Sequence, residues 1–335
     1  MRNMLTPYVW HFLGSVLCII IIIQQWTIQM AIQEFRTGAQ VVPQVAPKVV
    51  PPVAVAPPLI PPMVTKVVTA VPITNPPAAT TEATFDALPE FDERLLSHVK
   101  SILVKPNNRS VPYALQNPNA ADYSQEYTGT YILSLLKNKT NGFFFECGAF
   151  DGETFSNSLA LEKYFNWTGL LVEGSPKNVK VLLTKKRRSW ISPTCLSTTR
   201  KSMKVTFLDS TNTGKILGGA NHSVAKPPKY GSVVQSFCVP FNTLMKVLDI
   251  KHIDYLTLDV EGPEYEILQT IDFKSVTIDV MAVEFYYRPP EIYQEILKIM
   301  TGNGFVMVKK TRFDSIFVHS RIYQPSMAAT TKKTL

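Results

Sequence analysis

The chain has 335 residues, of which 45% are apolar and 18% are charged, and 25 are prolines. This composition fits one folded domain of about 250 residues with an added low-complexity segment, because single cores seldom grow beyond that size. The formal charge is +8 at pH 7, but apart from 185–188 and 309–312 the basic residues are scattered, and no aromatic platform is interleaved with them, so nucleic acid is not a favoured partner.

The N-terminal sequence predicts a membrane anchor. Residues 1–7 form a short tail. Residues 8–32 contain no Asp, Glu, Lys or Arg, and this stretch is long enough for the ~20 residues of a membrane-spanning helix. A cleaved signal peptide is the alternative, but it would end in small residues. Here bulky residues follow the apolar run, and Trp10 and Trp26 suit the two membrane interfaces. We therefore expect a single-pass signal anchor.

Residues 33–84 form a stalk rich in Pro, Val, Ala and Thr. Proline blocks helix and favours extended backbone, so this segment is expected to be a semi-rigid spacer or a plain disordered linker. Either would hold the folded domain away from a membrane. Four sequons behind an anchor predict a lumenal or extracellular domain with N-glycosylation, at Asn108, Asn138, Asn166 and Asn221.

The cysteines leave two alternatives open. Cys195 and Cys238 lie in two strand-like segments and form a disulfide if those strands are neighbours, or else stay as two buried thiols. Cys147 lies in a glycine-turn motif and would be unpaired.

The folded domain is divided into an N-terminal extension at 85–141, a core at 142–323 and a tail at 324–335. The extension carries four tyrosines and is expected either to pack across the sheet or to cover a ligand site. Strands are predicted at 142–147, 169–172, 190–196, 204–208, 233–239, 253–258 and 276–285, with a terminal hairpin at 305–308 and 315–318. Helices are predicted at 154–164, from 176 to the basic cluster, and at 241–248, 264–271 and 292–300, with a mobile loop at 209–232.

Alternating strands and helices predict an α/β fold with a doubly wound, Rossmann-like parallel sheet. We expect seven strands in that sheet, with the last pair antiparallel, as in S-adenosylmethionine-dependent methyltransferases.

A nucleoside-binding pattern follows the first core strand. Glu146 is followed by Gly148 two positions later and by Gly152 four positions after that. The phosphate-binding GxGxxG and P-loop patterns are absent from this segment. This suits a cationic, phosphate-free nucleoside. An acid about twenty residues later can accept both ribose hydroxyls. The predicted cofactor-binding residues are Glu146, Gly148, Ala149, Asp151, Gly152 and Glu173.

Further acids end the later strands, at Asp259, Glu261 and Glu284. Crowded acids raise one another's pKa and can act as a general base, so Asp259 and Glu261 are candidates for catalysis or substrate orientation. The alternative is that Asp259 and Glu264 only stabilise a helix N-terminus. No metal-ligand spacing stands out.

Taken together, these segments resemble the FkbM-type methyltransferase domain, in the strings FFFECGAFDGE, GLLVEGSP, TCLS, IDYLTLDVEGPEYEILQTIDF and VEF. Behind an anchor and a stalk, the chain is similar to invertebrate Star-like membrane proteins. The resemblance implies a fold that binds S-adenosylmethionine at Glu146, Gly148, Gly152 and Glu173, with Asp259 and Glu261 beside the acceptor.

The resemblance also implies a role in moving membrane-bound growth-factor precursors or other secretory cargo from endoplasmic reticulum to Golgi, with enzymatic activity retained or lost. The expected locations are the endoplasmic reticulum, Golgi, endosome or plasma membrane. An active O-methyltransferase on a glycan or small hydroxyl is the alternative. A Golgi glycosyltransferase ranks third, because the glycine loop has no role in such an enzyme.

Overall fold

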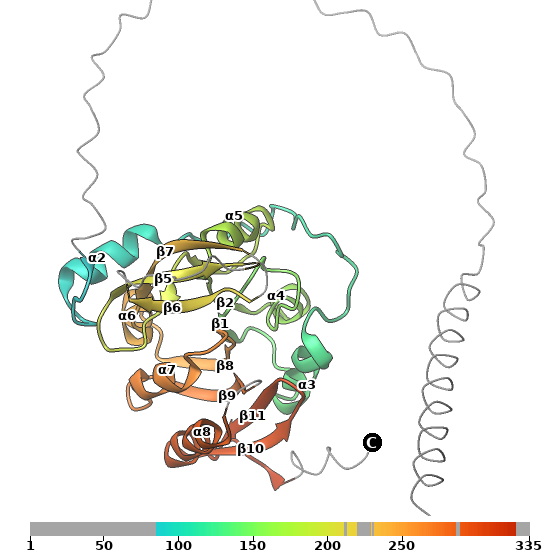
Figure 1. Cartoon of the computed structure of the whole chain (residues 1–335). Coiled ribbons are helices and arrows are strands. Elements are labelled where there is room, and N and C mark those ends of the chain that lie inside the picture. Colours follow the sequence, from blue (N-terminus) through green and yellow to red (C-terminus); the bar gives the residue numbers. More distant parts are fainter. Residues whose placement is uncertain (1–84, 211–212, 220–228, 230, 286–288, 326–335) are drawn as a thin grey trace, which may run out of the picture. The chain divides into compact units, whose positions relative to one another are not determined.

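The computed structural model describes residues 85–210, 213–219, 229, 231–285 and 289–325 (Figure 1). The predicted tail, anchor and stalk at 1–84, the sequon at Asn221 and the tail beyond residue 325 lie outside these ranges. Within them, none of the helices has both the length and the apolar composition that crossing a bilayer requires.

The main sheet has seven strands in the order β10-β11-β9-β8-β1-β2-β3. All neighbours pair in parallel except β11, which runs antiparallel to both β10 and β9. This confirms the predicted parallel sheet with an antiparallel final pair. The strands are β1 (Phe143–Cys147), β2 (Thr168–Val172), β3 (Trp190–Ser192), β8 (His252–Leu258), β9 (Thr277–Glu284), β10 (Phe305–Lys310) and β11 (Asp314–His319).

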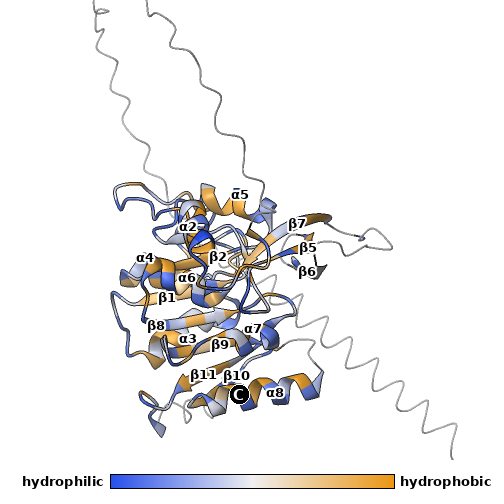
Figure 2. Cartoon of the chain, turned by 90° about the vertical axis from the view of Figure 1, so that its left-hand side faces the viewer, coloured by the Kyte–Doolittle hydropathy of each residue, from blue (hydrophilic) through white to orange (hydrophobic). Residues whose placement is uncertain are grey.

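Helices cover both faces of this sheet, and apolar residues run through its strands (Figure 2). One face packs against α2 (Glu93–Ile102), α6 (Phe241–Leu248), α7 (Glu264–Thr270) and α8 (Pro290–Gly302). The other packs against α3 (Thr128–Leu135), α4 (Leu159–Phe165) and α5 (Pro176–Thr184). Phe145 lies in the first core and Phe144 in the second, which is why β1 is continuously apolar.

A second sheet, in the order β4-β7-β5-β6, projects to one side of the first (Figure 2). Its strands are β4 (Cys195–Leu196), β5 (Met203–Asp209), β6 (Lys215–Gly219) and β7 (Ser232–Val239). The predicted strand at 190–196 was therefore wrong in its extent, since Pro193 separates β3 from β4 and proline cannot donate to a ladder. The predicted loop at 209–232 contains β6, which was not predicted because its glycines are unfavourable in strands. Residues 211–212, 220–228 and 230 of that segment lie outside the described ranges.

The predicted helix at 154–164 begins only at Leu159. Phe155 has a φ of +60°, which is incompatible with a right-handed helix. Two α-helices of the described residues, α2 and α3, were not predicted, and both lie in the N-terminal extension.

The extension packs on the main sheet, as one of the two expected alternatives had it, and it also contributes one residue to a cavity. Val104 forms an antiparallel bridge with Ile191 of β3, so the extension covers that edge of the sheet. Tyr123 packs on Leu159, the first residue of α4, and Gln125, in the short 3-10 helix η2 (Gln125–Tyr127), lines the cavity described below.

Candidate functional site

A cavity of about 360 Å³ lies at the carboxyl ends of β1, β2, β8 and β9. This is where a doubly wound sheet binds its ligands, and the volume falls in the range of small-molecule sites. The loop after β1 and the residues after β2 and β8 supply most of its lining. The second sheet adds Phe207, Gly214 and Ile216 as one wall.

The glycine loop and the acid of strand two meet at the same edge of the sheet, as the sequence predicted. The amides of Gly148 and Ala149 both donate to Val172 O, at 3.0 and 3.1 Å. Gly148 has a φ of +85°, and a Cβ there would lie 1.8 Å from Asp259 O. This glycine is thus required for the close approach of two strand ends, and it also lines the cavity.

Glu173 is buried and faces this cavity. Its two carboxylate oxygens accept the backbone N–H groups of Phe150 and Ser175, each at 2.7 Å. Burial raises the pKa of Glu173 to about 7. The side chain of Asn178 also hydrogen-bonds to this carboxylate, and with about four acceptor sites the group can still accept a hydroxyl from a ligand.

A second group of acids lies across the cavity. Ligand oxygens of Asp259, Glu261 and Glu284 all lie within 4.8 Å of one another, and the three residues line the cavity. Burial raises the pKa of Asp259 well above its usual range, and the charges of Asp314 and Glu261 add to this effect. Glu264 instead accepts the amides of Val260 and Gly262 and so holds the loop after β8.

The charged lining is wholly acidic among the described residues: it has four carboxylates and no Lys, Arg or His. A cavity of this kind favours a cationic ligand, because crowded carboxylates repel one another until a positive charge lies among them.

Three predicted cofactor residues lie outside the lining. Glu146 is buried and accepts the amide of Asn157 at 2.7 Å. Asp151 accepts the amides of Glu153 and Thr154 at 2.8 and 2.7 Å. A Cβ on Gly152 would lie 2.2 Å from Leu182 Cδ1. The loop therefore faces the cavity through other residues, Ala149, Phe150, Thr154, Phe155 and Asn157.

Other lining residues lie outside the motif and were not predicted, such as Gln125, Phe207 and Phe313. They come from the extension, the second sheet and the turn before β11. No local pattern marks them, because only the fold brings them to the strand ends.

Cys195 and Cys238 form a disulfide. They are register partners in the β4–β7 pair, which decides between the two alternatives left by the spacing. Cys195 also lines the cavity, while Cys147 is a buried thiol whose pKa burial raises. Asn108, Asn138 and Asn166 are exposed, as glycosylation would require.

Residues 146–307 match the family model of the methyltransferase FkbM domain. Over these residues, which are slightly less than half of the chain, the protein is similar to the methyltransferase FkbM domain, and its fold is an α/β fold with a mostly parallel sheet. This similarity supports S-adenosylmethionine as a possible cofactor. The residues present fit this group, because its sulfonium is cationic and the cavity of about 360 Å³ is lined by acids.

Among solved structures, the chain is similar to methyltransferase FkbM from Methylobacillus flagellatus KT, at 12% identity and a TM-score of 0.36, over 68% of this chain and 58% of that one. It is also similar to precorrin-6y C5,15-methyltransferase from Geobacter metallireducens GS-15, at 12% identity and a TM-score of 0.33, over 64% and 98% of the two chains. Likenesses this distant carry no conclusion about substrate. No curated protein matches the chain.

Proposed function

We propose that this protein is an S-adenosylmethionine-dependent methyltransferase. The observation that carries the proposal is the joint placement of the β1 loop and Glu173 on one cavity whose charged lining is acidic. The group that this cavity would hold supplies an electrophilic methyl on a sulfonium, and an acceptor must meet it with a nucleophile.

The residues divide between the two ends of the cavity. Glu173 is suited to accept a ribose hydroxyl through the acceptor site left by Phe150 N, Ser175 N and the Asn178 side chain. Asp259 and Glu261 are suited to orient the acceptor. A cation beside Asp259 lowers its raised pKa, which leaves a carboxylate able to take a proton from an acceptor hydroxyl.

Methyl transfer tests this proposal directly. Protein supplied with methyl-labelled S-adenosylmethionine should label oligosaccharides or small polyols, and Asp259→Asn should lower the rate about a hundredfold, the typical scale of a general base. Binding of the cofactor without transfer to any hydroxyl acceptor would contradict the catalytic role and favour a domain that has lost its activity.

Membrane anchorage, a lumenal location and Star-like transport of secretory cargo remain proposals from the sequence, because residues 1–84 lie outside the described ranges. The domain match supports the methyltransferase over the glycosyltransferase alternative.

A further inference from the structure

The loop between β1 and α4 has an unusual backbone for a segment that lines a cavity. Phe150 and Phe155 have φ values of +49° and +60°. Side chains with a Cβ adopt this left-handed region only at a cost, so it persists where surrounding contacts hold it. Both residues line the cavity.

Three buried groups supply such contacts from outside the loop. Glu173 accepts the amide of Phe150, and Glu146 accepts the amide of Asn157. Between these two points, Arg187 Nη1 donates to Gly152 O at 2.6 Å. The loop is therefore held near both ends and in its middle.

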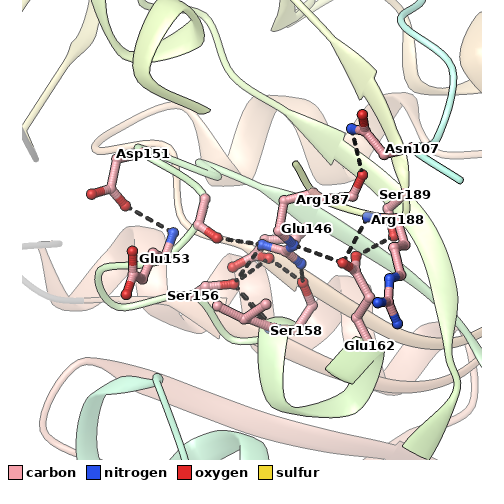
Figure 3. Close-up of polar contacts among 12 residues, drawn as sticks. Asn107, Glu146, Asp151, Glu153, Ser156, Ser158, Glu162, Arg187, Arg188 and Ser189 are labelled. Atoms are coloured by element: carbon pink, nitrogen blue, oxygen red, sulfur yellow. Dashed lines mark hydrogen bonds and ion pairs between the residues drawn. The ribbon is translucent and has the colours of Figure 1, made fainter. Parts of the chain in front are cut away.

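Arg187 has no exposed surface and lies between Glu146 and Glu162 (Figure 3). Its Nε pairs with Glu162 Oε1 at 3.1 Å. On the side of the loop, its Nη2 donates to Ser158 Oγ at 3.0 Å, and Ser158 Oγ in turn donates to Glu146. A buried charge with these partners is costly to displace, so the bridge is a rigid support.

We propose that Arg187 is a positioning residue, which joins Glu146 and Glu162 into a buried bridge that holds the β1 loop in the conformation that accepts the cofactor. Arg187 is not among the residues that line the cavity, so it acts through Gly152 and Ser158. The proposal rests on the proposed function only for its consequence in cofactor binding.

The bridge has two ends, which provide a matched pair of variants. Ser158 Oγ bonds to Glu146 and Arg187 beside the loop, and it makes no capping bond to α4. Ser189 Oγ donates to Glu162 Oε2 at 2.5 Å on the far side. Both serines are buried, so each alanine removes a comparable hydroxyl from the same network.

Hydrogen exchange of the cofactor-free, full-length protein tests the positioning itself. Ser158→Ala should speed exchange of the Phe150 and Asn157 amides about tenfold, whereas Ser189→Ala should leave these rates within about twofold. Titration with S-adenosylmethionine should show a parallel loss of affinity, about tenfold for Ser158→Ala and within about twofold for Ser189→Ala.

Arg187→Lys provides a second measurement in case Ser158→Ala fails to fold. Lysine keeps the charge but lacks the planar fork that reaches Gly152 O and Ser158 together, so exchange should again quicken in the loop. Equal loop exchange in Ser158→Ala and Ser189→Ala, or unchanged exchange in Arg187→Lys, would overturn the proposal. Absence of cofactor binding in the unmodified protein would instead contradict the proposed function, while the exchange rates still decide the positioning.

Discussion

The carboxylate of Glu173 accepts the backbone N–H of Phe150 at 2.7 Å. The acid that follows the second core strand thereby holds the loop that follows the first. Glu173 and the β1 loop, which are separated by more than twenty residues in sequence, form one structural unit at the cavity. A change to either should therefore alter the affinity for a ligand.

Substituting Glu173→Gln should weaken S-adenosylmethionine binding about tenfold, which corresponds to about 1.4 kcal/mol. The amide replaces one acceptor oxygen by a donor, which must then face a backbone N–H or a ribose hydroxyl. Titration calorimetry measures the change. Asp279→Asn is the control, because this acid pairs with Arg321 near the start of β9, at the opposite edge of the sheet. The affinity of this variant for S-adenosylmethionine should stay unchanged.

The stability of the protein should depend on pH through Glu173, whose pKa burial raises from 4.5 to about 7. Because the folded state binds this proton more tightly, the associated stability is present below pH 4.5 and is lost as pH rises through about 7. Urea unfolding at pH 5 and pH 8 should show a loss on the order of 2 kcal/mol from this group. Glu173→Gln should flatten the dependence, and an equal slope in both proteins would contradict the assignment.

Binding of a cation should release a proton from Asp259, whose pKa is raised by burial and by neighbouring acids. Calorimetry in buffers of different ionisation enthalpy should therefore detect proton release with S-adenosylmethionine. The release should be smaller with the uncharged thioether S-adenosylhomocysteine, and it should disappear in Asp259→Asn. Equal release with both ligands would argue against a cation beside Asp259.

Removing the disulfide should affect both stability and the cavity. The Cys195–Cys238 bond closes a 43-residue separation, and loss of such a crosslink costs about 2–4 kcal/mol. Because Cys195 lines the cavity, the double variant Cys195→Ala/Cys238→Ala should also bind S-adenosylmethionine several-fold more weakly. Thermal unfolding measures the stability, and titration measures the affinity. Lower stability with unchanged affinity would show that the disulfide does not contribute to ligand binding.

The main sheet could be predicted from the sequence because its strands are short apolar runs buried on both faces, such as β1 with Phe144 and Phe145. The placement of Gly148 beside Glu173 followed from the same topology, since parallel strands bring their carboxyl ends to one edge. These predictions depend on periodicity and on residues adjacent to strand ends.

The second sheet and the direction of Glu146 could not be predicted in this way. β6 contains two glycines and gains its structure by pairing with β5. Glu146 belongs to the glycine pattern, but its side chain turns to Ser156 and Ser158 rather than to the cavity. A sequence pattern gives the position of a strand end, whereas the direction of a buried acid depends on the groups that surround it in the fold, here the hydroxyls of Ser156 and Ser158 and the nearby charge of Arg187.

The cofactor site is tested most directly by titration of the full-length protein with S-adenosylmethionine, side by side with Glu173→Gln. We expect saturable binding at one site in the unmodified protein and an affinity about tenfold lower in the variant. An absence of binding at millimolar ligand, or equal affinity in the two proteins, would contradict the claim that the β1 loop and Glu173 form the cofactor site.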